Sequence, residues 1–236
     1  MKKYLLPILL AFLYCCGVGA ISEEKPHAQE IPQKNEIAIK TPTSGVYPIE
    51  ATSKHEYPRE EDTLQASIAG YNYYFYTDGR IKEENTNAGT VKNFKVLNES
   101  IVERAYLHHL NGNLLVFYTD TDSEMAGSKV ELLNRETGEV IYSNDIWGFN
   151  LGQPIIFGMK SYVTAIGFVG KLDLRTGKYD WKHHDLYDHQ KDSFNSFDSV
   201  DVGESMVEFI SLHHRNKTED KVIVDDKTGK IIRIVK

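Results

Sequence analysis

Cysteine is almost missing from the chain of 236 residues, and the two that occur, Cys15 and Cys16, both lie within its first twenty residues. If those residues are removed as a leader, the mature protein has no cysteine and no disulfide, even in an oxidising compartment. Its stability then has to come from core packing, and a domain of this size buries enough surface for that.

Clustered positive charge is also missing, because 27 Lys and Arg stand against 34 Asp and Glu and no basic block occurs. Nucleic acid is therefore not expected as a partner, since phosphate binding needs a concentrated positive field. Helical periodicity is missing too. The chain contains no nucleophile elbow, zinc-binding helix or phosphate loop, so the catalytic residues are unknown from sequence. Carboxylate pairs leave no local signature, and they keep a hydrolase open as an alternative.

The N-terminus reads as a targeting signal. Lys2 and Lys3 precede an apolar run, and Val18-Gly19-Ala20 places small residues where a signal peptidase cuts. We predict a signal peptide at 1–20 and a periplasmic or secreted protein with no transmembrane span in its mature form. The alternative is a lipoprotein anchored at Cys15 or Cys16, although Tyr14 replaces the small residue usual before a lipidated cysteine.

Residues 21–60 differ in composition from the rest of the chain, since they hold five of its seven prolines and few apolar residues. Such a segment cannot bury enough surface to offset the entropy of ordering. We predict an extended Pro-rich linker at 21–60 and a repeat domain at 61–236.

Three units of the repeat domain align on a Thr-Gly pair, at Thr137-Gly138, Thr176-Gly177 and Thr228-Gly229. Asn or Asp stands three positions before each Thr, where it can accept hydrogen bonds from the turn, and Gly supplies the positive φ of a tight hairpin. Apolar strands precede each hairpin, among them "LLVFY" (114–118), "YVTAIGFV" (162–169) and "MVEFISL" (206–212). A weaker fourth unit spans 64–97, with Ala88-Gly89 in place of Thr-Gly.

Self-similarity at 40 to 50 residues, with about four strands in each unit, indicates an all-β fold. We predict a small or partial β-propeller made of four-stranded antiparallel meander blades.

The motif "LDLRTGKYDW" (172–181), with weaker versions at 132–142 and 222–233, resembles the pyrroloquinoline-quinone-like repeat of quinoproteins. The resemblance covers about 130 residues and implies propeller blades. Dehydrogenases of this family have seven or eight blades and an adjacent cysteine pair beside the quinone. Here at most four blades are countable, and Cys15-Cys16 lies in the signal peptide, so no cofactor is expected.

Metal binding is not expected either. The pairs His108-His109, His183-His184 and His213-His214 sit on strands or strand ends, where adjacent side chains point to opposite faces. The stretch "DTDSE" (120–124) starts like a calcium loop, but Met125 replaces the required glycine.

A non-catalytic binding protein is the favoured function. One version is an immunity or inhibitor protein, and a second is an envelope-assembly accessory factor; the alternative is an envelope hydrolase using convergent carboxylates. The partner is expected to be another protein or an envelope component. Exposed aromatic side chains and an acidic loop are the candidate contacts: Tyr71, Tyr73, Trp147, Tyr187, Asp188, Asp192 and Asp198.

Overall fold

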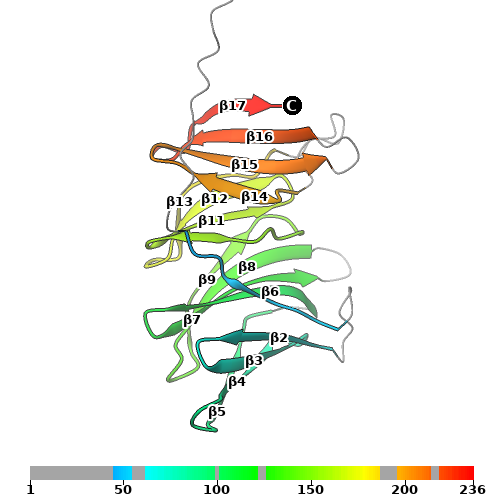
Figure 1. Cartoon of the computed structure of the whole chain (residues 1–236), viewed down its shortest axis with the longest axis vertical. Helices are drawn as coiled ribbons and strands as arrows, with labels where there is room; N and C mark the ends of the chain where they lie inside the picture. Colours follow the sequence, from blue (N-terminus) through cyan, green and yellow to red (C-terminus); the bar gives the residue numbers. More distant parts are fainter. Residues whose placement is uncertain (1–44, 55–61, 99–100, 122–125, 187–195, 214–217) are drawn as a thin grey trace, which may run out of the picture. The chain divides into compact units, whose positions relative to one another are not determined.

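The computed structural model describes residues 45–54, 62–98, 101–121, 126–186, 196–213 and 218–236. Every regular element within these ranges is a β-strand, and four antiparallel sheets follow one another along the chain (Figure 1). The expected four-stranded meanders are therefore confirmed. The described ranges hold no helix long and apolar enough to cross a membrane. The predicted signal peptide lies outside them.

The sheets are numbered here in chain order. The first contains β2 (Thr63–Ile68), β3 (Tyr71–Tyr76), β4 (Arg80–Asn85) and β5 (Val91–Lys95). The second contains β1 (Ile49–Ala51), β6 (Ile101–Leu110), β7 (Asn113–Thr121), β8 (Ala126–Leu133) and β9 (Val140–Ile146). The third contains β10 (Ile155–Phe157), β11 (Lys160–Ala165), β12 (Phe168–Asp173) and β13 (Lys178–His183). The fourth contains β14 (Ser199–Val202), β15 (Met206–His213), β16 (Thr218–Asp225) and β17 (Ile231–Val235).

The last hairpin of every sheet has the same turn. A glycine with φ between 65° and 78° donates its N–H to the carbonyl four residues earlier, over 2.8–2.9 Å. The acceptor residue is Asn or Asp, and its side chain also accepts N–H groups of the turn. The first sheet follows the rule, so the weaker fourth unit is confirmed. The four pairs are Asn85 and Gly89, Asn134 and Gly138, Asp173 and Gly177, and Asp225 and Gly229.

Three hydrophobic cores lie between consecutive sheets. Each contains fully buried side chains from both of the sheets it separates, such as Phe75 and Tyr118, Phe117 and Phe168, or Val169 and Phe209. The two middle sheets are therefore packed on both faces.

Aromatic side chains of one sheet dock on the glycine turn of the next. The Tyr142 hydroxyl donates to the Leu174 carbonyl over 3.0 Å, and the Trp181 indole N–H donates to the Asp226 carbonyl over 2.9 Å. A Cβ added at Gly177 would meet the Tyr142 ring, and one at Gly229 would meet the Trp181 ring. Glycine is thus needed at each of these two turns for two reasons: its positive φ and the close approach of the aromatic ring.

One strand prediction was wrong in its bounds. The run "YVTAIGFV" is not a single strand, because a turn at Ile166 and Gly167 divides it between β11 and β12. The φ of Gly167 is 61°, which a continuous strand does not accommodate.

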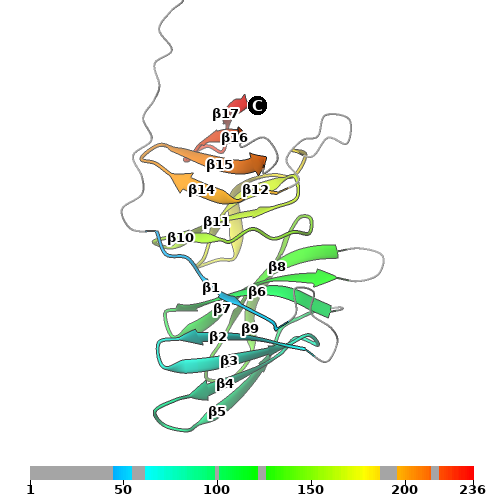
Figure 2. The same cartoon turned by 45° about the vertical axis from the view of Figure 1, so that its right-hand side comes forward.

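The end of the predicted linker is also corrected. Val46 exchanges two hydrogen bonds of 2.7 Å with Ile156, β1 pairs with β6, and Thr52 pairs with Gln65. Residues 46–52 therefore pair in turn with β10, β6 and β2, which belong to the third, second and first sheets (Figure 2). Pro48 lies between the pairings, where no N–H is required, so the proline-rich composition hid an edge segment.

Candidate protein-binding surface

Two connections between neighbouring sheets expose large side chains. The connection from β9 to β10 carries Trp147 and Phe149, with exposed fractions of 63% and 48%. The connection that follows β13 begins with His184, whose ring meets the Trp147 ring edge-on at a centroid distance of 5.9 Å. Tryptophan is the side chain most often found at the energetic centre of protein interfaces.

Both connections are anchored to the turn between β11 and β12. Ile166 donates its N–H to the Phe149 carbonyl over 2.9 Å, and Leu186 donates its N–H to the Gly167 carbonyl over 3.1 Å. One rigid turn of the third sheet therefore positions the exposed side chains of both segments, which lowers the entropy lost when they are contacted.

Two glycines allow the first connection to approach its neighbours closely. Gly148 has a φ of 90°, and a Cβ there would lie 2.9 Å from the Ile166 carbonyl oxygen. A Cβ at Gly152 would lie 2.9 Å from the Phe197 carbonyl oxygen. Side chains at these positions would push the connection away from the third sheet.

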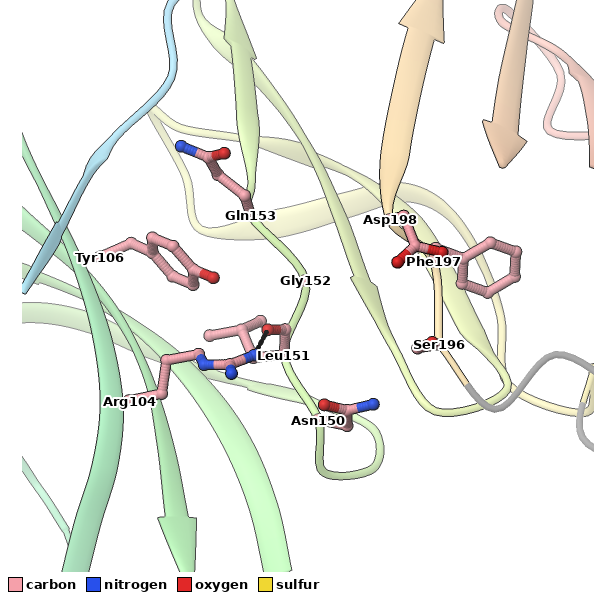
Figure 3. A pocket seen from close by; sticks show the side chains of 9 residues that line it. All are labelled: Arg104, Tyr106, Asn150, Leu151, Gly152, Gln153, Ser196, Phe197 and Asp198. Carbon is pink, nitrogen blue, oxygen red and sulfur yellow. Dashed lines mark hydrogen bonds between the residues drawn. The ribbon is translucent and has the colours of Figure 1, made fainter. Parts of the chain in front are cut away.

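A pocket of about 250 Å³ is lined in part by the same β9–β10 connection, at Asn150, Leu151 and Gly152 (Figure 3). Arg104 donates from Nη1 to the Leu151 carbonyl over 3.1 Å, and its Nε lies 3.7 Å from the Glu50 carboxylate. Across the pocket, Asp198 accepts the Leu212 N–H over 2.6 Å. Nine residues line the pocket: Arg104, Tyr106, Asn150, Leu151, Gly152, Gln153, Ser196, Phe197 and Asp198.

The chemistry of this pocket suits a polar contact. Burial, together with the nearby Glu50 carboxylate, raises the pKa of Tyr106 to about 12, so its hydroxyl stays neutral at physiological pH. Guanidinium, carboxylate and amide groups can pair with main-chain or charged groups of a partner. Pockets for drug-sized ligands are usually larger and mainly apolar. Trp147, Phe149, His184 and the lining residues are called the connection surface below.

The predicted contact residues do not all reach this surface. Trp147 and Asp198 do. Tyr73 was expected to be exposed, which is wrong: it is 1% exposed, and its hydroxyl donates to Glu83 over 2.5 Å.

Tyr71 is half-buried on the same face of β3, with the Arg135 guanidinium 4.4 Å from its ring centroid. The alternation in "YNYYFY" fixes which tyrosines share a face, but it does not say which face the core covers. Tyr187, Asp188 and Asp192 lie outside the described residues.

Three buried carboxylates have structural partners. Glu83 binds Arg135 Nε at 2.9 Å as well as Tyr73. Glu131, which was weighed as a calcium ligand, accepts from the Tyr118 hydroxyl at 2.9 Å and from Ser143 at 3.1 Å.

Asp173 is the third of these carboxylates. Hydrogen bonds from Arg175 and Lys160 hold its pKa well below the usual range, against a smaller opposing effect of burial. These groups stabilise the sheets and their junctions.

The histidine pairs divide between faces, as the strand argument requires. His109 lies 2.6 Å from the Tyr73 hydroxyl through Nε2, and burial lowers its pKa. His183 contacts the Gly229 carbonyl at 2.7 Å through Nε2, whereas His184 is exposed beside Trp147. The side chains of the third pair are not described. Over the described ranges, no three His, Cys, Asp or Glu side chains are grouped so as to hold a metal ion.

Three residues on this surface were not predicted from the sequence. Phe149 follows Trp147 in "WGFN" and could have been included as part of the same turn. Arg104 and His184 belong to the surface only because segments from the second and third sheets meet there, which no local pattern reports.

The chain matches no protein-family model and no curated protein. Solved structures that are similar to it include a quinohemoprotein alcohol dehydrogenase from Comamonas testosteroni, with 12% identity and a TM-score of 0.48 over 81% of this chain and 37% of that one. BamB from Moraxella catarrhalis has 12% identity and a TM-score of 0.48 over 84% of this chain and 64% of BamB. The computationally designed Ika4 protein has 16% identity and a TM-score of 0.41 over 66% and 87%.

The chain spans about 36 to 40% of the length of the dehydrogenases it matches. Quinoproteins occur among these structures, as the repeat resemblance implies. Likeness at this level concerns the arrangement of strands and not the activity.

Proposed function

We propose that this protein is a non-catalytic binding protein of the bacterial cell envelope, and that it recognises another protein through the connection surface. The observation that carries the proposal is the exposed Trp147, whose ring makes an edge-on contact with the His184 ring. The two residues lie on different connections, and both connections are anchored to the turn between β11 and β12. Arg104 and Asp198 add polar groups in the pocket that the β9–β10 connection also lines. A rigid aromatic anchor with a polar surround is the usual composition of a protein interface.

The engagement of the buried carboxylates supports binding over hydrolysis. A general acid or base needs access to a substrate and a pKa matched to its task. Glu83 and Glu131 are instead 3% and 0% exposed and are bound by neighbouring hydroxyl and cationic groups.

A competition experiment tests the surface. A photoreactive amino acid replaces Phe149 in the full chain, and the variant is irradiated with an envelope fraction. We expect one main cross-linked adduct. Excess wild-type protein should abolish this adduct by competition, whereas the same excess of Trp147→Ala protein should leave at least half of it.

Ile141→Ala is the matched control for this competition. Ile141 is 50% exposed on β9, away from the two connections, so this variant should compete as well as wild type. Equal competition by Trp147→Ala and wild type would contradict the proposal.

The identity of the adduct separates the two versions of the function. An inhibitor or immunity protein captures a toxin or hydrolase, whose activity falls when the purified chain is added. An accessory factor captures a component of an assembly machine and leaves hydrolytic activity unchanged. N-terminal sequencing of the exported chain tests its location. We expect Ile21 as the first residue; a lipid-bearing Cys15 or Cys16 as the first residue would mean that the chain is a membrane-anchored lipoprotein.

A further inference from the structure

The first and the fourth sheets each have one face that contributes to none of the three cores formed by the described residues. On the first sheet this face includes the row Gln65, Tyr74, Lys82 and Asn93 across β2–β5. On the fourth it includes the row Ser199, Ile210, Lys221 and Val235 across β14–β17. They are called the first end face and the last end face.

The last end face carries apolar side chains between its charged ones. Ile210 and Ile223 are only 7% and 5% exposed, although they belong to none of the three cores. Leu212 on the same face is 41% exposed. Glu208 and Lys221, whose charged ends lie 3.5 Å apart, flank the two isoleucines in the pairing register.

The first end face presents tyrosine rings beside cations. The Lys82 ammonium lies 5.3 Å from the centroid of Tyr74, and the Arg80 guanidinium lies 5.0 Å from that of Tyr76. Both tyrosines are half-buried. Their rings offer flat apolar surface that aliphatic side chains can cover.

The strand residues of the two end faces have opposite net charge. Three cations and one anion give the first end face a charge of +2, whereas two cations and four anions give the last end face −2. Opposite potentials favour contact between the two faces and disfavour contact of either face with its own kind. The residues are Arg80, Lys82, Lys95 and Glu84 on the first face, and Lys221, Arg233, Asp201, Glu208, Glu219 and Asp225 on the last.

The size of the faces selects the kind of contact. In both sheets the four strands average about six residues, so each face spans about 19 by 19 Å and offers about 350 to 400 Å². A stable interface needs about 800 Å² from each partner. One end face supplies about half of this, and both faces of one copy together supply nearly all of it.

We propose that two copies of this chain form a closed head-to-tail dimer, in which the last end face of each copy covers the first end face of the other. Each contact joins a last end face to a first end face, and a two-fold axis relates the two contacts, so the interface as a whole is isologous and no end face is left open. The eight sheets of such a dimer lie within the range of four to eight blades that propellers use.

Mass measurement of the purified full chain by light scattering, from 1 to 100 µM, is the first test. We expect twice the chain mass, with partial dissociation at high salt because of the charged contacts. A monomer at 100 µM would overturn the proposal, and so would oligomers that keep growing with concentration, since an unclosed contact polymerises.

Charge reversal gives a sharper test. Lys82→Glu with Lys95→Glu makes the first end face −2, and Asp201→Lys with Glu208→Lys makes the last end face +2. Each double variant alone should dimerise at least tenfold more weakly than wild type, because its two faces now carry like charge. Mixed one to one, the two variants should form a heterodimer, because each contact again joins opposite charges.

Two controls protect this reading. Circular dichroism must show wild-type strand content and a melting temperature within a few degrees in each double variant, since none of the four side chains belongs to one of the three cores. Trp147→Ala should dimerise like wild type, so loss of partner binding and loss of self-association are separate failures. The proposal would be overturned if either charge-reversal variant dimerised as strongly as wild type, or if the one-to-one mixture of the two variants stayed monomeric.

Discussion

The junction between the first and second sheets and the junction between the third and fourth sheets each contain an ion pair, but the latter also contains a buried indole. In the first junction Glu83 accepts from Arg135 at 2.9 Å and from Tyr73 at 2.5 Å. In the last junction Trp181 lies on the Gly229 turn and donates to the Asp226 carbonyl at 2.9 Å. Glu83 and Lys171 occupy corresponding places, two positions before the Asx residue of their own turn, and their partners Arg135 and Asp226 both follow the Asx residue of the next turn. The two ion pairs therefore have exchanged charges, and Trp181 adds apolar area to the last junction.

All three junctions between consecutive sheets share a main-chain carbonyl that accepts a hydrogen bond. The carbonyl that follows the Asn or Asp of each turn accepts a hydrogen bond from the preceding sheet, at Arg135, Leu174 and Asp226 in turn. The donors differ, and they are Lys92, Tyr142 and Trp181. The repeat therefore preserves the turn geometry and leaves the docking side chain free to change.

The largest difference should come from removing the indole. Trp181 is 8% exposed and packs against Phe209, so Trp181→Ala should cost about 3 to 5 kcal/mol of unfolding free energy. Trp147→Ala, at an exposed position, should cost less than about 0.5 kcal/mol. Urea unfolding followed by circular dichroism measures both, and equal costs would contradict the assignment of Trp181 to the core.

The glycine turns give the next comparison. Gly229 and Gly89 have φ values of 74° and 65°, so alanine strains the backbone at both by about 1 kcal/mol. A Cβ at Gly89 meets nothing within 4 Å, whereas one at Gly229 meets the Trp181 ring. Gly229→Ala should therefore lose a further 1 to 3 kcal/mol, as overpacked sites do, about 2 to 4 in total. Equal urea midpoints for the two variants would show that the ring contact contributes nothing.

These turns also explain how much of the fold was predictable. An Asx residue followed four positions later by glycine encodes its own geometry within five residues, so the hairpins and the repeat register could be found from sequence, including the weak unit at Asn85. The division of "YVTAIGFV" was missed because Ile166 and Gly167 interrupt an apolar run without a polar turn residue.

The candidate surface was predictable only in part, for a different physical reason. Trp147 stands out by its residue type in a turn-rich segment. Tyr73 has the same alternating pattern as exposed Tyr-rich strands, and its burial depends on the neighbouring sheet. Arg104 reaches the pocket through contacts between segments 47 residues apart, such as its hydrogen bond to Leu151. Such encounters depend on how the sheets pack and leave no local signature.

Neutralising the Glu83–Arg135 ion pair should lower the free energy of unfolding by less than Trp181→Ala or Gly229→Ala does. Glu83→Gln keeps an acceptor for Tyr73 and removes the charge that balances Arg135, at a cost of about 1.5 to 2 kcal/mol. Combining it with Arg135→Met should recover at least half of that loss, because no unbalanced charge is left at the junction. Additive losses in the double variant would instead show that each side chain stabilises the junction independently.

The pH dependence of the first junction is the smallest expected effect. Burial lowers the pKa of His109, and the positive charge of Arg135 lowers it further. Because the unfolded histidine titrates near 6.5, the unfolded chain takes up the proton first as the pH falls. Stability is therefore retained at pH 7.5 and declines as the pH passes below about 6.5. His109→Gln should reduce the drop in urea midpoint between pH 7.5 and 5.5, whereas the part due to half-buried His108, on the opposite face, should remain. If the drop is unchanged in His109→Gln, the pH sensitivity lies outside the junction between the first and second sheets.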